Sequence, residues 1–222
     1  MFNHVELDLP SLEREVIDGV RYYKVPGKEE LQKFVSITSV TSHFSKEKFA
    51  AWRKKVGDEE ADRITRKATS RGTDAHTLIE HHLKNMTLTD DVLPISKHLF
   101  QIAIPALNRI NNIYALEGSL YSQYLGVAGT VDCIAEFDGE LSIIDFKTSK
   151  QPKPREWIDG YFVQCCAYAC MLHELTGLSV NKFVIIMTCE NGEVEVYEEY
   201  DKAKYIRMLT QYIKKFVNDK LP

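Results

Sequence analysis

The sequence predicts an α/β or α+β domain in which helices cover both faces of a mixed central sheet. Between residues 120 and 147, apolar and polar side chains alternate in three segments, which is typical of strands. Two more strands are expected at 180–189 and 193–200, on either side of the turn residues Glu190-Asn191-Gly192. Apolar side chains at helical spacing occupy much of the chain before residue 115 and the segment between the two groups of strands. Together these patterns give the fold class.

The remaining elements follow from the same periodicities. Extended segments at 20–25 and 34–40 precede helices at 46–56, after Gly57, from about Thr73, and at 98–114. Strands at 120–125, 129–137 and 141–147 come next, then a helix at 156–175, the second strand pair, and a last helix at 201–218 with Asp201 as its N-cap. No repeat or long linker interrupts the chain. We therefore expect one domain over residues 1–222, with an extended and helical region at 1–115 and an αβ core at 116–222.

Charge is distributed unevenly along the chain. The 28 Lys/Arg and 32 Asp/Glu residues give a formal net charge of −4, which at first argues against a nucleic-acid partner. Residues 46–71, however, hold nine Lys/Arg against five Asp/Glu, and residues 147–155 hold four against none. These two segments could bind a polyanion locally, although solvated helix and loop faces would give the same pattern.

Neither secretion nor membrane insertion is indicated. No run of about eighteen apolar residues is present, and the N-terminus carries Glu6, Asp8 and Glu13 instead of a basic segment followed by an apolar one. The five cysteines are an odd number and lie inside apolar stretches, which suits buried thiols in a reducing compartment. We expect an intracellular, cytoplasmic protein without a membrane partner.

The dipeptide Asp138-Gly139 lies between two alternating segments and predicts a two-residue hairpin turn of type I′. If Phe137 pairs with Glu140, the same register places Asp132 opposite Asp145. The β-carbons of directly opposed residues are only about 5 Å apart, so two carboxylates there repel each other unless a positive charge lies between them. The hairpin therefore predicts an unusual concentration of negative charge.

The same register also places Lys147 on the face that carries these two carboxylates, opposite Thr130. A divalent cation beside an ammonium group would relieve the repulsion, and Mg²⁺ prefers carboxylate oxygens as ligands. A solvated hairpin face with Lys147 in a surface ion pair remains the alternative from spacing alone.

Several motifs in a fixed order resemble those of the PD-(D/E)XK nuclease superfamily. They are Val131-Asp132, Asp145-Phe146-Lys147, and Gln164 with Tyr168 four residues later, which is the Q-x-x-x-Y motif of the RecB-like branch. The segment from Arg71-Gly72 to His76 resembles the R-G-x-x-x-H helix of that branch, and Ser39-Val40-Thr41 with Trp52 is similar to the mitochondrial genome maintenance exonuclease group and its phage and bacterial relatives. Val131 stands where the superfamily name has proline.

This resemblance implies a set of site residues and a cofactor. Asp132, Asp145, His76 and the main-chain carbonyl of Phe146 would hold Mg²⁺ or Mn²⁺, and Lys147 would orient or help deprotonate the attacking water. Gln164 and Tyr168 would face the same site from the next helix. Some related nucleases hold an iron–sulfur cluster through closely spaced cysteines, but only Cys189 follows Cys170 here, so no iron–sulfur cluster is expected.

The implied activity is a metal-dependent DNA exonuclease acting on single strands or frayed ends in replication, recombination or repair, in a bacterial or phage-infected cell. Replication or recombination proteins would be its partners. Lys150, Lys153 and Arg155 could follow a phosphate backbone, with Arg71 as a further contact. Trp52, within a basic helix, could stack on a base.

Alternatives remain open at this point. The fold could serve a catalytically inactive nucleic-acid-binding module or a structure-specific endonuclease. His76 could be a half-buried structural histidine, and Trp52 and Tyr168 could be core residues. Glu117, just before the expected core strands, is an undecided candidate for the site.

Overall fold

The protein, described here by a computed structural model over residues 1–27 and 30–220, is built on one mixed sheet. Among these residues, eight strands are arranged in the order β1-β2-β3-β5-β6-β7-β8, with β4 paired to β5 beside this path. The β3–β5 and β6–β7 pairs are parallel, and β4–β5, β5–β6 and β7–β8 are antiparallel. The predicted mixed sheet is confirmed.

The strands are β1 (Glu13–Ile17), β2 (Val20–Pro26), β3 (Leu31–Ser36), β4 (Ile110–Ser122), β5 (Val127–Phe137), β6 (Glu140–Ser149), β7 (Lys182–Cys189) and β8 (Val194–Glu199). The helices are α1 (Ile37–Phe44), α2 (Lys46–Val56), α3 (Asp58–Leu83), α4 (Pro94–Leu107), α5 (Asp159–Thr176) and α6 (Lys202–Lys220), with a short 3₁₀ turn, η1 (Arg155–Trp157). Within the described residues, none of these helices has both the length and the apolarity needed to cross a membrane.

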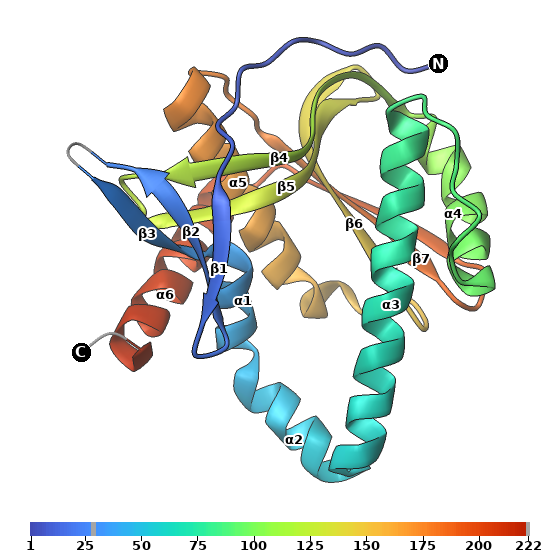
Figure 1. Ribbon diagram of the computed structural model, residues 1–222, viewed down its shortest axis with the longest axis horizontal. Coiled ribbons are helices and arrows are strands. Elements are labelled where there is room, and N and C mark those ends of the chain that lie inside the picture. The colour runs from blue at the N-terminus through green and yellow to red at the C-terminus, as the bar shows by residue number, and fades with distance from the viewer. Residues whose placement is uncertain (28–29, 221–222) are drawn as a thin grey trace.

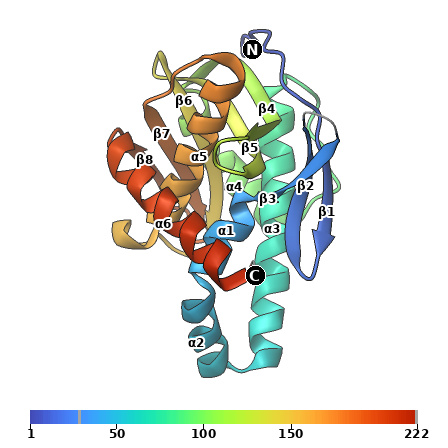
Figure 2. The ribbon, with the colours of Figure 1, turned by 90° about the vertical axis from the view of Figure 1, so that its left-hand side faces the viewer.

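Helices cover both faces of the sheet (Figures 1 and 2). On one face, α3 and α4 pack against side chains such as Ile144, Phe146 and Val184. On the other face, α1, α5 and α6 pack against side chains such as Ile143 and Ile185. Every residue of β7 is buried, as expected for a central strand with both faces covered. The predicted layers are therefore confirmed.

The segment 46–70, here called the helical arm, projects from the body of the molecule (Figure 2). It comprises α2 and the first half of α3, which Figure 1 shows running away from the sheet and meeting at its far end. Ala61 is its one buried residue, and α2 has none. The arm is thus amphipathic in sequence but has almost no core of its own.

The helix predicted at 98–114 is wrong at its C-terminal end, because α4 ends at Leu107 and β4 begins at Ile110. The apolar residues Ile110 and Ile113 are three apart, as on a helix. In the structure, register shifts around Asn111 and Ile113 interrupt β4 and bring both isoleucines to the core. Of the strand expected at 120–125, only residues 120–122 are in a strand, and they form the last part of the longer strand β4, which ends at Ser122.

Two other N-terminal predictions were also wrong. Residues 37–40, expected to be extended, begin α1, because burial of Ile37 and Val40 against the sheet outweighs the low helix propensity of β-branched residues. The two helices expected after Gly57 and near Thr73 are the single helix α3. By contrast, the predicted cap of the last helix is confirmed, since Asp201 Oδ1 accepts the Lys204 N–H at 2.9 Å.

Candidate active site

The site lies where β5 and β6 diverge. The predicted hairpin register is confirmed from Phe137↔Glu140 to Cys133↔Ile144, where the described ladder ends. Toward its start, β5 pairs in parallel with β3 instead, at Val127 and Ala128. The residues between these two pairings keep their pairing with β4 but have no strand partner on the side of β3 and β6, which leaves an opening at this edge.

Asp132 lies in this opening and bridges the two strands. Its Oδ2 accepts the main-chain N–H of Phe146 at 2.9 Å. The expected Asp132–Asp145 and Thr130–Lys147 pairs lie beyond the described ladder, and Thr130 instead contacts the Tyr23 hydroxyl at 3.1 Å. Asp132 nevertheless lies close enough to Asp145 for its charge to raise the pKa of that carboxyl group.

Asp145 is almost fully buried, with 1% of its surface exposed. Its Oδ2 lies 2.5 Å from Lys147 Nζ, and its Oδ1 accepts a hydrogen bond from Gln164 Nε2 at 3.2 Å. The same amide donates to the Tyr168 hydroxyl at 3.2 Å. The structure thus brings Asp145, Lys147, Gln164 and Tyr168 together, with the last two presented by α5 one turn apart.

His76 reaches the site from α3. Its Nε2 lies 2.8 Å from the Phe146 carbonyl, and its Nδ1 lies 3.7 Å from Asp132 Oδ2. In the tautomer that donates from Nε2 to this carbonyl, Nδ1 keeps a lone pair on the side of Asp132. Histidine ligands of metals commonly donate their other N–H to a main-chain carbonyl in this way. The Phe146 carbonyl itself, expected to be a ligand, is here the acceptor for His76.

Glu117 completes a cluster that the sequence left undecided. It stands in β4 between the pairs Leu116↔Cys133 and Gly118↔Val131, and therefore beside Asp132, with a positive φ of 50°. Ligand atoms of His76, Glu117 and Asp132 all lie within 4.8 Å of one another. The positive φ, uncommon outside glycine, marks an irregular point of the strand at the site.

The environment of the site shifts the pKa values of two of its carboxyl groups and of its lysine upwards. Burial raises the pKa of Asp145 to about 6, an effect that Lys147 opposes and Asp132 increases. Although Glu117 is exposed to solvent, desolvation by the groups around its carboxyl and the charge of Asp132 raise its pKa to about 7. Burial lowers the pKa of Lys147, but Asp145 and Asp132 raise it by more, so this side chain is an ammonium at neutral pH. Lys147 thus offsets the charge of Asp145 and, in part, of Asp132, while Glu117 has Asp132 as its acidic neighbour in the cluster.

A divalent cation fits this set of donors. Carboxylate oxygens with one imidazole suit Mg²⁺ or Mn²⁺. Asp145 Oδ2 is buried and makes no hydrogen bond among the described residues, so Lys147 is its one close charge partner. A cation among Asp132, Asp145, Glu117 and His76 would offset both the desolvation and the mutual repulsion that raise the pKa values of Asp145 and Glu117.

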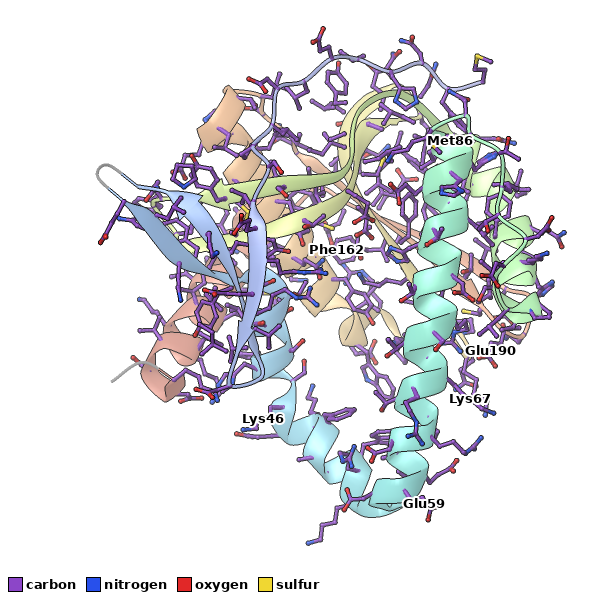
Figure 3. The ribbon with its side chains drawn as sticks, viewed as in Figure 1. Lys46, Glu59, Lys67, Met86, Phe162 and Glu190 are labelled. Carbon is purple, nitrogen blue, oxygen red and sulfur yellow. The ribbon has the colours of Figure 1, made fainter. Side chains whose placement is uncertain are left out.

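Most of the side chains expected to bind DNA have partners within the protein. Arg71 is nearly buried, forms an ion pair with Glu190, and lies 3.3 Å from Thr148 Oγ1; Figure 3 shows Glu190 beside α3. Lys153 Nζ donates to the Tyr161 hydroxyl at 2.6 Å. Arg71 therefore fastens α3 to the sheet five residues before His76, which is a positioning role.

The remaining three differ in their surroundings. Arg155 forms ion pairs with Asp159 and Glu199 and donates to the Tyr205 hydroxyl, so its guanidinium is held within the fold. Lys150 is exposed on the loop after β6. Trp52 is half-buried on the helical arm, with its ring 5.3 Å from that of Phe49. Lys150 and Trp52 are thus the predicted contacts that stay accessible.

Gly129 allows Tyr168 to pack against β5. A Cβ at this position would lie 2.8 Å from Tyr168 Cε1 and 3.1 Å from Ile37 Cγ2. We expect Gly129→Ala to displace Tyr168 and to lower the free energy of unfolding by about 1–3 kcal/mol, as overpacking of a filled core does. Denaturant unfolding measures this change. Gly160→Ala is the control, because nothing lies within 4 Å of a Cβ there; equal stability of the two variants would show that Tyr168 yields without cost.

The chain belongs to the PD-(D/E)XK nuclease superfamily, whose sequence model matches residues 42–220. This family and the observed mixed sheet with its flanking helices agree with the fold that the motifs implied. The ordered motifs at Asp132, Asp145-Phe146-Lys147 and Gln164 all lie inside the matched region.

Curated relatives carry a more specific name. The human mitochondrial genome maintenance exonuclease 1 is 29% identical over 128 residues, which are 52% of this chain and 36% of the relative. The protein of the same name from Xenopus tropicalis is 42% identical over 90 residues, or 39% of this chain and 26% of the relative. The chain thus matches about a third or less of these relatives' length. A crystal structure of a protein from Eubacterium rectale is also similar, with 11% sequence identity and a TM-score of 0.43. The match covers 68% of this chain and 65% of the Eubacterium rectale chain.

Proposed function

We propose that this protein is a metal-dependent DNA exonuclease that hydrolyses phosphodiester bonds at the ends of single strands. The observation that carries the proposal is the cluster of His76, Glu117 and Asp132 beside the Asp145–Lys147 pair. The exonuclease names of the curated relatives support the choice of activity. Mg²⁺ or Mn²⁺ is the proposed cofactor.

Hydrolysis requires a positioned water and compensation of the negative charge that grows on the phosphate. A bound divalent cation supplies part of this compensation and lowers the pKa of its water. Lys147, held as an ammonium between Asp145 and the Tyr161 ring 5.1 Å away, would supply the rest. Because its pKa is raised, we assign Lys147 to charge compensation and water orientation rather than to proton abstraction.

Gln164 would keep the carboxylate of Asp145 turned toward the site. Its amide donates to Asp145 Oδ1 and to the Tyr168 hydroxyl, so the two polar side chains of α5 act as one unit. Both are more than nine-tenths buried, which fixes their rotamers. In this proposal Tyr168 is a positioning residue.

The preference for strand ends is proposed from the helical arm. The arm carries Phe49 and Trp52 together with basic side chains on α2, and it leads into the part of α3 that presents His76. Basic and aromatic side chains together suit a single strand. A strand passing between the arm and the sheet would have to be threaded, and threading needs a free end.

A direct test compares linear and covalently closed circular single-stranded DNA of equal length with Mn²⁺. We expect the linear strand to be degraded to short products while the circle persists, with labels at either end giving the direction. Cutting of the circle at a comparable rate would favour the structure-specific endonuclease. Binding of both without cutting would favour the inactive module. Replication, recombination or repair in the cytoplasm, with proteins of those pathways as partners, is the proposed setting.

A further inference from the structure

A concave surface lies away from the carboxylate cluster. It is a pocket of about 610 Å³ between the β1–β2 turn, α1, the start of α2 and the end of α6. Its volume is within the range of sites that hold small organic ligands. None of the residues of the candidate active site lines it, so it is not part of the site described above.

Cationic side chains reach this pocket from three separate elements. Arg21 comes from β2, Lys46 from the first residue of α2, where Figure 3 marks it, and Lys220 from the end of α6. Among the described residues, the guanidinium of Arg21 and the Nζ of Lys46 make no ion pair. Asp18 is the one acidic side chain of the lining. The pocket therefore has an excess of positive charge in a chain that is acidic overall.

Hydroxyl groups and an aromatic ring also line the pocket, beside the apolar side chains of Val16, Val20 and Phe216. Ser42 and Ser45 line the pocket, and within the described part of the chain their hydroxyls make no hydrogen bond. Phe49, on the next turn of α2, forms part of the wall and is 47% exposed. Cations with free hydroxyls suit a phosphate, and an uncovered aromatic ring beside them suits a base.

The walls are held in place before any ligand binds. The Arg21 main-chain N–H donates to Ser39 Oγ at 3.1 Å, which ties the β1–β2 hairpin to α1. His43 Nε2 lies 2.8 Å from Asp219 Oδ2, which ties α1 to α6. A preformed pocket loses less entropy when it binds a ligand than one that must be assembled.

Helix α1 connects the pocket with the strand that carries Asp132. α1 begins directly after Ser36, which pairs with Ala128 of β5, four residues before Asp132. The eight residues of α1 rise about 12 Å, and Thr38 and Ser39 from its first turn already line the pocket. A strand that leaves the cluster along α1 would therefore meet the pocket about one helix length away.

We propose that this pocket binds one nucleotide of a single-stranded DNA substrate, its phosphate against Arg21 and Lys46 and its base on Phe49, away from the bond that is cut. The inference rests on the proposed function and adds a second anchoring point to it. Such an anchor would hold the strand between successive cuts.

The test measures binding of a fluorescein-labelled 20-residue oligothymidylate by anisotropy in EDTA, where no cutting occurs, at several salt concentrations. The Arg21→Ala/Lys46→Ala variant should bind at least about five times more weakly. The slope of log Kd against log salt should fall by about 0.7, since both side chains are proposed to neutralise the same phosphate and each lost phosphate contact on a single strand contributes about 0.7. Phe49→Ala should weaken binding without changing this slope, because stacking does not release counterions.

The matched control is Arg207→Ala/Lys214→Ala, which removes the same charge from exposed positions of α6 that do not line the pocket. If the Arg21→Ala/Lys46→Ala variant behaves like this control, the pocket proposal is overturned while the proposed function stands. If the wild-type protein itself does not bind the strand, the proposed function and the pocket both fail. Thermal unfolding of each variant shows whether an effect comes from misfolding.

Discussion

Lys147→Ala is expected to lower turnover on linear single-stranded DNA by about 10²-fold or more, the usual loss when a charge partner of the transition state is removed. The ammonium of Lys147 lies 2.5 Å from Asp145 and 22% of its side chain is exposed, so it can face a phosphate held at the site. Single-turnover rates with labelled DNA at saturating enzyme measure the chemical step itself.

Binding of metal and DNA should survive this substitution. Lys147 is not a ligand in the proposed site, and its removal frees Asp145 Oδ2 from its one close charge partner. Calorimetry with Mn²⁺ should therefore show equal or tighter affinity. Lys214→Ala, at an exposed position of α6, is the control for loss of a positive charge. Unchanged turnover of Lys147→Ala would remove this lysine from the chemistry, and loss of Mn²⁺ binding would make it a residue that positions Asp145.

The hairpin at the site was predictable because a local signal fixed a long-range register. Asp138 and Gly139 both have positive φ, as a type I′ turn requires, and the ladder then follows from counting residues. The register cannot be extended in this way beyond Cys133. There β5 stops pairing with β6, and nearer its start it pairs with β3 instead. That change of partner depends on β3, which lies 92 residues earlier in the chain (Val35 pairs with Val127), and no local pattern in β5 reveals it.

The same turn signal also occurs at Asp18-Gly19 and was missed. These residues have positive φ as well, and they join β1 to β2. The segment 13–17 alternates weakly because β1 is an edge strand whose side chains are mostly exposed. At such an edge strand the turn dipeptide is a stronger signal than the apolar pattern of the strand before it.

Glu117 shows what sequence alone leaves open at the site. Its place in the metal-binding cluster depends on β4 running alongside β5 with register shifts, and the apolar spacing at residues 110–113 predicted a helix instead. His76, by contrast, was found through the ordered motif that leads from Arg71. The motif identifies His76, and the structure adds that the ion pair between Arg71 and Glu190 holds α3, the helix that carries His76, in place.

Asp145→Asn and Asp132→Asn are both expected to abolish binding of Mn²⁺, because each removes a charged ligand from the proposed site. Activity should be lost with it. Calorimetric titration with Mn²⁺ measures the first effect. Retained binding in either variant would show that the carboxylate concerned is not a ligand.

Without metal the two substitutions should differ in stability. Asp145→Asn leaves the Lys147 ammonium without its partner at 2.5 Å in a buried setting, so the free energy of unfolding should fall by about 2 kcal/mol or more. Asp132→Asn keeps an oxygen that can accept the Phe146 N–H and removes repulsion with Glu117 and Asp145, so stability should hold or rise. Thermal unfolding in EDTA separates these cases. An equal loss in both variants would mean that Asp132 also serves a structural ion pair, with His76 at 3.7 Å as its partner.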